Sequence, residues 1–185
     1  MEPDYLERLA SASPTPGGGS AATVVAAMGA ALVAMAARIT GENPKYAPEH
    51  ALARRLVAQA DALREKLIAA RARDEAAFDA VMKSRGEGRR RALREAAQAP
   101  LDAMRDALEV ERLALEAKTL GNPHLASDLI CAAEFAAAAI AALAINVGIN
   151  HRWLKDDAIV ATQRNEMQRY ERESSRLLRA MRGRE

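Results

Sequence analysis

The sequence has few of the residues that β-sheets need. Aromatic residues make up 3% of its 185 residues, whereas hydrophobic residues make up 50%, and alanine supplies much of that share. Alanine and leucine favour helices, while aromatic and β-branched side chains favour strands. We therefore expect an all-α fold. The length is that of one ordinary domain, which we place at residues 1–185.

Disulfides and an excess of one charge are missing too. Cys131 is the only cysteine, so no internal disulfide can form, and a reducing, cytoplasmic location is expected. The chain starts with an acidic stretch and lacks the basic start of a secretory signal. Its 27 Lys and Arg residues nearly balance 25 Asp and Glu residues, which gives a net charge of +2. This balance provides no strong attraction to nucleic acid or to a membrane surface.

Two long segments are almost without charge. Residues 21–37 carry none, and residues 129–150 carry only Glu134. Both consist mainly of alanine, which anchors a helix in a membrane more weakly than leucine does, and the first is short for a membrane span. A helix that is apolar on all sides can equally occupy the centre of a soluble bundle. We expect these two Ala/Gly-rich helices at the centre of the fold, with leftover surface that pairs with a second copy of the chain.

The other segments show helical periodicity. Residues 47–84 carry a continuous apolar stripe that contains one carboxylate, Asp74. Pro100 is expected to kink the next helix, and the last helix is charged and should lie on the outside. These further helices are expected at residues 3–11, 89–120 and about 157–181.

Residues suited to helix capping precede both alanine-rich segments. Ser20 precedes the first, and Ser127 or Asp128 precedes the second. Ser and Asp side chains accept hydrogen bonds from the free N–H groups at a helix start. We expect the first helix to end near residue 40 and the second near residue 150. The chain is thus predicted to be a single-domain helical bundle with long antiparallel helices.

The segment before the first long helix is the most informative local feature. Three consecutive glycines let the backbone come close to a ligand, and the free N–H groups of a helix start favour an anion or a partly negative oxygen. A tight turn that allows two helices to pack would explain the same glycines. The pattern matches neither the phosphate loop nor the dinucleotide fingerprint. It reads Ser13-Pro14-Thr15-Pro16-Gly17-Gly18-Gly19-Ser20.

This segment, together with the helix that follows it, resembles the signature of the formiminotetrahydrofolate cyclodeaminase and methenyltetrahydrofolate cyclohydrolase family. The helix contributes Met28-Gly29-Ala30-Ala31-Leu32-Val33. Two later segments also resemble the family: Asp74-Glu75-Ala76-Ala77-Phe78 and Gly121-Asn122-Pro123-His124-Leu125-Ala126-Ser127-Asp128. Asn146 and Asn150 lie where the family tends to place asparagines. The resemblance implies an all-helical dimer that acts on one-carbon groups carried by a tetrahydrofolate derivative, without metal.

Three residues are candidates for proton transfer. Asp74 would be costly as a buried charge, and burial would raise its pKa toward the range of a proton carrier. A structural carboxylate tied to an arginine or a helix end is the alternative. Asp128 could simply cap its helix, or it could bind the aminopyrimidine edge of a pterin or face a cationic one-carbon centre. His124 is a candidate because histidine is the usual side chain for proton transfer near neutral pH, although a loop histidine is usually just solvated.

Candidate folate-binding residues are mainly backbone and amide groups. Asn146 and Asn150 share one helix face, but about 27 Å of helix separates Asn146 from Asp128. Asn146 and Asp128 could contact opposite ends of an extended ligand, or they could belong to two different sites. The full set is Pro16, Gly17, Gly18, Gly19, Ser20, Lys45, Asn122, Ser127, Asn146 and Asn150.

Several charged residues remain open to two interpretations. Lys45 and the arginines at 85, 89, 90, 91 and 94 could meet the glutamate tail of folate, or the arginines could form a solvated helix start. The segment that contains Lys45 has fewer lysines than its counterparts in the family. Glu134 could form an ion pair or point into the pocket.

The predicted function is that of a folate enzyme. It would cyclise 5-formiminotetrahydrofolate to 5,10-methenyltetrahydrofolate with release of ammonia, or hydrolyse 5,10-methenyltetrahydrofolate. The sequence does not separate the two reactions, because both need the same kinds of group. A non-catalytic helical dimer that holds folate or a partner helix is the first alternative. A basic helical module for nucleic acid is the weaker one, because stacking aromatics are scarce. We expect a homodimer with no metal, no nucleic acid and no membrane.

Overall fold

The chain folds into helices throughout the part that the structure describes. The computed structural model describes residues 4–183, and no strand occurs in that range. Its α-helices are α1 (Tyr5–Leu9), α2 (Gly18–Glu42), α3 (His50–Lys83), α4 (Gly86–Ala117), α5 (Ala126–Trp153) and α6 (Asp157–Met181). Short 3-10 turns are η1 (Pro44–Glu49), η2 (Lys118–Leu120) and η3 (Pro123–Leu125). The predicted all-α class is confirmed.

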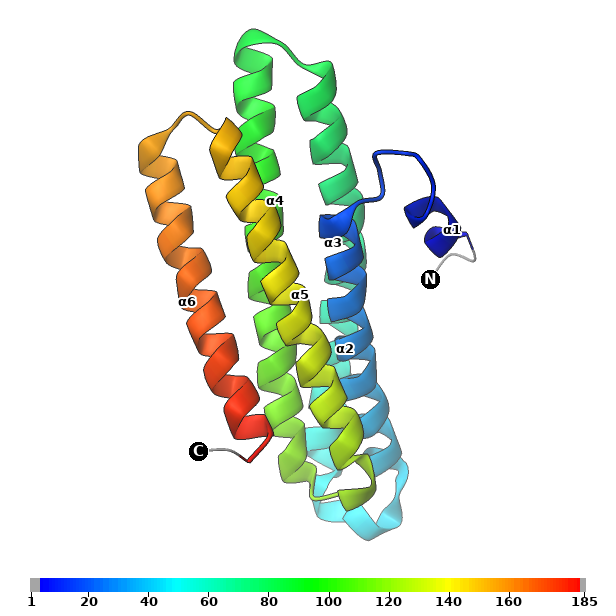
Figure 1. Cartoon of the computed structure of the whole chain (residues 1–185). Helices are drawn as coiled ribbons and strands as arrows, with labels where there is room; N and C mark the ends of the chain where they lie inside the picture. The colour runs from blue at the N-terminus through cyan, green and yellow to red at the C-terminus, as the bar shows by residue number, and fades with distance from the viewer. Residues whose placement is uncertain (1–3, 184–185) are drawn as a thin grey trace.

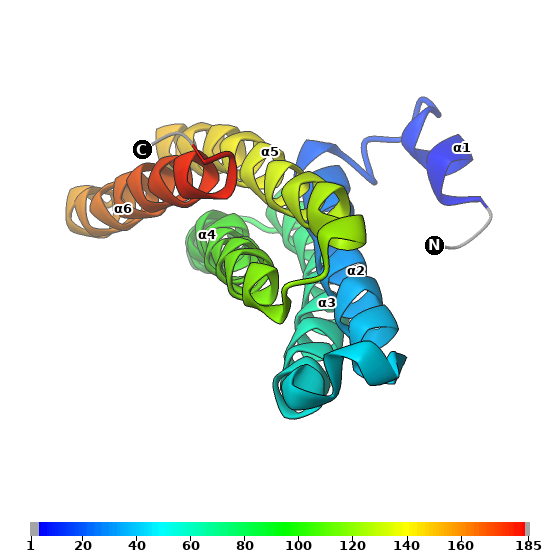
Figure 2. The ribbon, with the colours of Figure 1, turned by 90° about the horizontal axis from the view of Figure 1, so that it is seen from below.

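The five long helices, α2 to α6, run alternately in opposite directions along one axis (Figure 1). Helix α2 packs against α3, α4 and α5, whereas the charged helix α6 packs mainly against α4 and α5. Helix α6 therefore lies on the outside, as its charge pattern predicts. Helix α1 stands apart from the bundle on one side, joined to the start of α2 by a loop (Figures 1 and 2).

Small side chains let the two alanine-rich helices approach closely. A Cβ atom on Gly29 of α2 would lie 2.8 Å from the carbonyl oxygen of Ala132 in α5, so only glycine fits at this crossing. Larger side chains of α4, such as Met104 and Leu108, are fully buried in the same core. By length and hydropathy alone, α2 and the segment Pro123–Trp153 could each cross a membrane, although both contribute to this core.

Both predicted serine caps are wrong, and the helices start earlier than expected. Helix α2 begins at Gly18 with Gly17 as N-cap, so Ser20 lies inside the first turn. Helix α5 begins at Ala126 with Leu125 as N-cap, and neither Ser127 nor Asp128 caps it. Glycines can enter a helix when tertiary contacts satisfy its free N–H groups, and local propensity does not anticipate such contacts.

Other boundaries differ from expectation by a few residues. Helix α3 starts at His50 because the preceding prolines form the 3-10 turn η1. Helix α4 starts at Gly86, whose φ of 53° makes the turn from α3, and it continues through Pro100. The start of α6 is confirmed, since the Asp156 side chain accepts from the N–H of Ile159 at 3.2 Å. Of the helix expected at residues 3–11, Pro3 lies outside the described residues.

Glu111 of α4 is a buried carboxyl that the sequence pattern does not single out. Its side chain is 1% exposed and faces α6, where the Ser174 hydroxyl donates to Oε1 at 2.8 Å. Its Oε2 has no hydrogen-bond partner among the described residues. Burial raises the pKa of Glu111 to about 8, against the smaller lowering effect of the Ser174 hydrogen bond. Glu111 is therefore protonated at neutral pH.

This proton makes the stability of the α4–α6 contact depend on pH. Because the folded-state pKa lies above the ordinary value of 4.5, the folded chain keeps a proton that the unfolded chain releases. The contribution of protonated Glu111 to the stability of the fold is fully present below about pH 4.5 and is lost as the pH rises through about 8. Between those two pH values, the Tm of the wild type should fall as the pH rises. In Glu111→Gln, which has no proton to lose at this position, Tm should change less with pH. Glu109→Gln, a neighbour on α4, should keep the wild-type slope, and an unchanged slope in Glu111→Gln would contradict the assignment.

Candidate functional site

A cavity of about 470 Å³ opens where four helix ends meet. Helix α2 has 25 residues and α3 has 34, so the α3–α4 hairpin extends beyond the start of α2 (Figure 1). The cavity lies in the space that a longer α2 would occupy. Its walls are Pro14, Thr15, Gly17, Gly18, Gly19, Asp74, Ala77, Phe78, Val81, Met82, Arg89, Leu93, Ala96, Asn146, Ile149, Asn150 and Trp153. The volume suits a small organic ligand.

Asp74 of α3 sits directly over the start of α2. A Cβ atom on Gly19 would lie 2.5 Å from Asp74 Oδ1, so the close approach requires glycine at this position. The carboxylate accepts a hydrogen bond from the backbone N–H of Ser20. Asp74 thus supplies, from another helix, the cap that α2 lacks locally.

The pKa of Asp74 is raised above its ordinary value of 3.8, chiefly because burial disfavours the charged form. The hydrogen bond from Ser20 lowers it, and the nearby charge of Glu75 raises it further. No ion pair involves Asp74 among the described residues. Of the two structural alternatives, the arginine partner is therefore not found there, whereas the helix end is, because Asp74 accepts the N–H of Ser20 at the start of α2.

A hydrogen-bonded group behind Asp74 holds α1 and the glycine segment to α3. The Ser20 hydroxyl donates to Glu75 Oε1 at 2.8 Å and pairs with the Tyr5 hydroxyl at 3.0 Å. Arg8 forms an ion pair with Glu75 at 3.3 Å. Ser20 and Tyr5 are fully buried. Ser20 therefore supports the cavity from behind instead of lining it, and the buried Pro16 does not line it either.

Two asparagines from the end of α5 form the wall opposite Asp74. Pro100 has no N–H, so the carbonyl of Ala96, four residues earlier in α4, is left without its helical donor. The Asn150 amide nitrogen donates to that carbonyl at 2.6 Å, which orients the side chain. Asn146 donates to the Ala142 carbonyl at 2.9 Å. In the described structure neither amide oxygen has a partner, so both can accept hydrogen bonds from a ligand.

Large apolar side chains surround the mouth of the cavity. Phe78, Met82, Ile149 and Trp153 keep between 40% and 62% of their surface exposed. Among the described residues of the wall, Asp74 is the only acid and Arg89 the only base. An apolar cavity with one carboxyl and two amides suits a flat, polar-edged ring system.

The structure brings together only part of the predicted site. Asp74, Gly17, Gly18, Gly19, Asn146 and Asn150 line the cavity. Of the remaining predictions, Pro16 and Ser20 lie behind it, and the others lie at the opposite end of the bundle.

Those other residues gather around the start of α5 and the end of α2. Asn122 accepts from the N–H of His124 at 3.2 Å and donates to the Thr40 hydroxyl at 3.1 Å, which ties this turn to α2. Lys45 lies 5.6 Å from the ring centre of Tyr46. Asp128 and Ser127 lie in the first turn of α5. Within one copy of the chain, none of these side chains reaches the cavity.

Sequence reasoning missed three apolar residues of the rim, which are Met82, Ile149 and Trp153. It did consider Arg89, as a possible contact for the glutamate tail. The residues at 146, 149, 150 and 153 follow each other at helical spacing, which places them on one face of α5. That spacing, with an exposed tryptophan at its end, was an available signal. Glu134 takes the structural alternative, since it pairs with Arg182 at 2.6 Å far from the cavity.

Comparisons with known proteins agree with one family. The sequence model described as formiminotransferase-cyclodeaminase matches residues 3–169. The methenyltetrahydrofolate cyclohydrolase of Methylorubrum extorquens is 34% identical over 177 residues, which are 89% of this chain and 85% of that protein. The formimidoyltransferase-cyclodeaminase of Sus scrofa is 30% identical over 173 residues, which are 86% of this chain and 32% of that protein.

A solved structure shows the same fold over the full length. The formiminotetrahydrofolate cyclodeaminase of Thermotoga maritima superposes with a TM-score of 0.91 at 29% identity, covering 98% of this chain and 94% of that one. The resemblance seen in the glycine segment and the later motifs is thereby confirmed. The chain belongs to the formiminotransferase-cyclodeaminase family.

Proposed function

We propose that this chain hydrolyses 5,10-methenyltetrahydrofolate to 10-formyltetrahydrofolate. The single observation that carries the proposal is Asp74, a carboxyl with a raised pKa and the only acid among the described residues of a mainly apolar cavity. The substrate is a cation with a flat pterin ring. A carboxylate favours that cation, and the amide oxygens of Asn146 and Asn150 can accept from the ring N–H groups.

Asp74 can carry the proton through both halves of this reaction. A water molecule attacks the methenyl carbon while the Asp74 carboxylate accepts one of its protons. In the resulting adduct the carbon–N5 bond breaks, and Asp74 returns its proton to N5. The hydroxyl of the adduct loses its proton to solvent as the formyl C=O forms on N10. Asp74 ends as the carboxylate, and one proton is released overall.

Cyclodeamination of 5-formiminotetrahydrofolate is the second candidate, favoured by the close superposition on the Thermotoga maritima cyclodeaminase. There N10 attacks the carbon of the protonated formimino group and loses its proton, and the resulting amine leaves as ammonia after gaining one. Asp74 would accept the first proton and supply the second. Neither route as proposed uses a metal. The described residues contain no group of three or more His, Cys, Asp or Glu side chains placed to hold an ion.

The absorbance of the methenyl species tests both candidates directly. With 5,10-methenyltetrahydrofolate the absorbance should fall faster than in an enzyme-free control, and with 5-formiminotetrahydrofolate it should rise faster. Acceleration with only one substrate would identify the reaction. Folate binding without acceleration of either would favour the non-catalytic dimer, and salt-sensitive binding to DNA or RNA would favour the nucleic-acid module.

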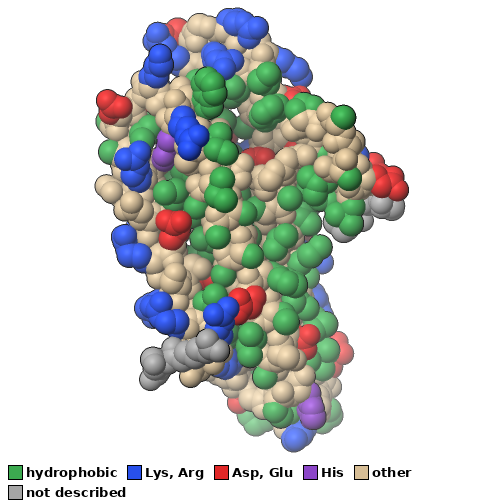
Figure 3. All heavy atoms as spheres, in the orientation of Figure 1, with side chains coloured by type: hydrophobic (Ala, Val, Ile, Leu, Met, Phe, Trp, Pro, Cys, Tyr) green, Lys and Arg blue, Asp and Glu red, His purple; other side chains and the backbone are tan. Residues whose placement is uncertain are grey.

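We further propose a homodimer, working in the cytoplasm. The outer faces of α2 and α5 form a nearly uncharged surface beside the cavity, visible as the hydrophobic band in Figure 3. Five large exposed side chains lie on it: Met28, Ile39, Phe135, Ile145 and Ile149. A second copy would cover this surface without exposing it to lipid. An antiparallel pairing of two α5 helices would bring Asp128 and His124 of one copy toward the cavity of the other.

The dimer can be broken on that surface. Light scattering of the wild type should give about twice 19.9 kDa without detergent. Ile145 is 65% exposed in one copy, so Ile145→Asp should fold normally and shift the mass toward the monomer. Ile68→Asp, an exposed apolar residue on α3, is the matched control and should remain a dimer. A monomeric wild type would contradict the proposal.

A further inference from the structure

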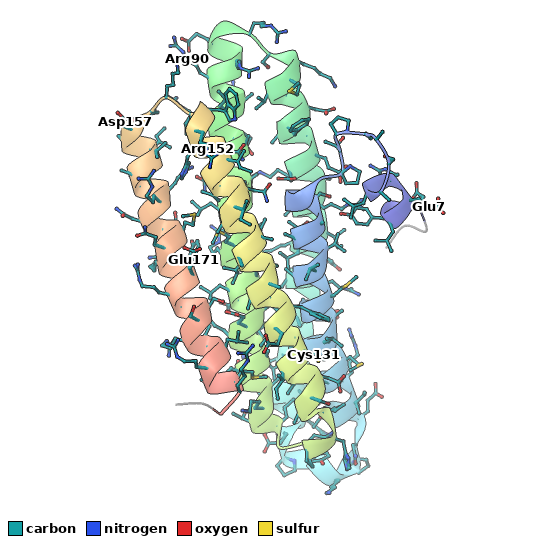
Figure 4. The ribbon with its side chains drawn as sticks, in the orientation of Figure 1. Glu7, Arg90, Cys131, Arg152, Asp157 and Glu171 are labelled. Carbon is teal, nitrogen blue, oxygen red and sulfur yellow. The ribbon has the colours of Figure 1, made fainter. Side chains whose placement is uncertain are left out.

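Helix α1 is attached to the bundle through one buried side chain. It stands apart from the other helices in Figures 1 and 2, and Tyr5 is the only buried residue among its five. Figure 4 shows Glu7 on the side of α1 that faces away from α2 and α3. The guanidinium carbon of Arg71 in α3 lies 5.1 Å from the centre of the Tyr5 ring, a favourable contact between a cation and an aromatic face. The polar end of Tyr5 points to the start of α2, where its hydroxyl meets Ser20.

The hydrogen bonds of Tyr5 and Ser20 can run in only one direction. A carboxylate only accepts, so the Ser20 hydroxyl uses its single proton to reach Glu75 Oε1 at 2.8 Å. The Tyr5 hydroxyl, 3.0 Å from Ser20 Oγ, must then donate to it. Arg8 binds the other carboxylate oxygen of Glu75 at 3.3 Å. Glu75 is therefore the common acceptor that joins α1, the start of α2 and α3.

This network ends on the same residue that holds Asp74. The backbone N–H of Ser20 donates to the Asp74 carboxylate, while the Ser20 side chain is held by Glu75. The preceding glycine leaves no free space, since a Cβ atom on Gly19 would lie 2.5 Å from Asp74 Oδ1. A displacement of Ser20 therefore displaces the Asp74 carboxylate. Among the described residues, those that line the cavity do not include Tyr5, Ser20 or Glu75, so the network acts from behind the wall.

We propose that Glu75 is a positioning residue for catalysis: through the hydroxyls of Ser20 and Tyr5 it fixes the start of α2, and thereby the place of Asp74 in the cavity. The inference rests on the proposed function, in which Asp74 carries the proton. Misplacing a proton carrier on the ångström scale lowers turnover, whereas the residues that contact the substrate stay in place. Loss of Glu75 should thus lower kcat and leave KM nearly unchanged.

The charge of Glu75 has a second effect on its neighbour. Two adjacent negative charges disfavour each other, so Glu75 raises the pKa of Asp74 in addition to the larger effect of burial. The other charged groups around this network are Arg71 on α3, Arg8 on α1 and Arg89 on α4, and the described cavity wall contains no charged residue from α2 or α5. Removing the charge of Glu75 should therefore lower the pKa of Asp74 and move the acid limb of kcat/KM to lower pH.

Two substitutions of Glu75 separate its position from its charge. Glu75→Gln keeps an acceptor for the Ser20 hydroxyl, so kcat should stay within about twofold of the wild type, while the acid limb moves to lower pH. Glu75→Ala removes the acceptor as well, so kcat should fall about tenfold with KM within about twofold, and the acid limb should move in the same direction. Glu65→Gln and Glu65→Ala, at an exposed position of α3, are the matched controls and should change neither readout.

Tyr5→Phe tests the other end of the network. It removes the hydroxyl that donates to Ser20 and leaves the charge of Glu75 in place. We expect kcat to fall by about threefold or more, while the acid limb stays at the wild-type pH. Tyr46→Phe, in η1 at the opposite end of the bundle, is the control and should behave as the wild type. A shifted acid limb in Tyr5→Phe would contradict the separate roles of position and charge.

A readout without substrate separates this inference from the proposed function. In protein labelled with carbon-13 at the aspartate carboxyls, the NMR signal of Asp74 is the one missing from Asp74→Asn. Its titration midpoint should move to lower pH in Glu75→Gln and stay unchanged in Glu65→Gln.

The two readouts give distinct outcomes. An unchanged kcat in Glu75→Ala, or a KM that rises as much as kcat falls, would overturn the positioning role. An unchanged midpoint in Glu75→Gln would overturn the charge effect. If the wild type accelerates neither folate reaction, the proposed function fails and the positioning role for catalysis fails with it. A shifted midpoint would in that case still establish the interaction between Glu75 and Asp74.

Discussion

Replacing Asp74 by asparagine should lower turnover by about 10²-fold or more, the usual span for a lost acid–base group. Asparagine keeps the size of the side chain and can still accept the N–H of Ser20 at the start of α2. It removes a carboxyl whose pKa is raised mainly by burial, so no buried charge has to be accommodated. The melting temperature should stay the same or rise, and folate binding should change only a few-fold.

The pH dependence gives this variant a second readout. The pKa of Asp74 is raised, so the carboxylate that acts as base is lost on acidification at a higher pH than for an ordinary aspartate. The wild-type profile of kcat/KM should therefore fall on the acid side, and Asp74→Asn should lose that limb. Normal turnover in the variant would make Asp74 a structural cap and shift attention to Asp128 in a dimer. If the variant does not fold, the carboxylate itself is required for stability, through the contact of Asp74 with the start of α2.

Replacing Gly19 by alanine should damage both stability and turnover. The new methyl group would lie 2.5 Å from the Asp74 carboxylate, so either the carboxylate or the start of α2 must move. Overpacking of this kind typically costs about 1–3 kcal/mol. A displaced proton carrier should lower kcat by about tenfold or more, because catalysis is sensitive to misplacement on the ångström scale. Thermal melts and the methenyl absorbance assay measure the two effects.

A double variant separates this clash from a general effect on the helix. In the Asp74→Ala background the carboxylate is absent, so adding Gly19→Ala should cost little further stability, and the two changes should be strongly non-additive. Gly148→Ala is the matched control, since a Cβ there meets no atom within 4 Å. At Gly18 a Cβ would make an ordinary 3.9 Å contact with Asn146. Additive costs in the double variant would contradict the proposed contact between Gly19 and Asp74.

Much of this architecture could be predicted from local pattern. The apolar stripe of α3 continues through Asp74, and helical periodicity alone therefore placed a carboxylate on an inward face. The alanine and glycine content of α2 and α5 anticipated their close crossing at Gly29. The glycine segment and the later motifs identified the family. Each of these features depends on residue spacing within one segment of the chain, and that spacing can be read directly from the sequence.

Local sequence pattern predicted the helix starts and the residues that line the site less well. Ser20 has the ideal chemistry for a cap, yet it donates to Glu75, and Asp74 from another helix accepts the N–H of Ser20. Asn150 is oriented by a carbonyl that Pro100 leaves free in α4. Such contacts join residues more than fifty positions apart. No local propensity encodes them, because their free energy depends on how the helices pack.

The sequence by itself determined the helical class, the family, and the three glycines, Asp74 and the two asparagines as groups of interest. The tertiary structure decided which of these groups act together. The α3–α4 hairpin outreaches α2 and leaves a cavity at that end, so Asp74, Gly19 and Asn146 meet there, while Asp128 and Lys45 remain at the other end. The reason is geometric: a helix rises about 1.5 Å per residue, so groups far apart along α5 cannot share one pocket within a single copy.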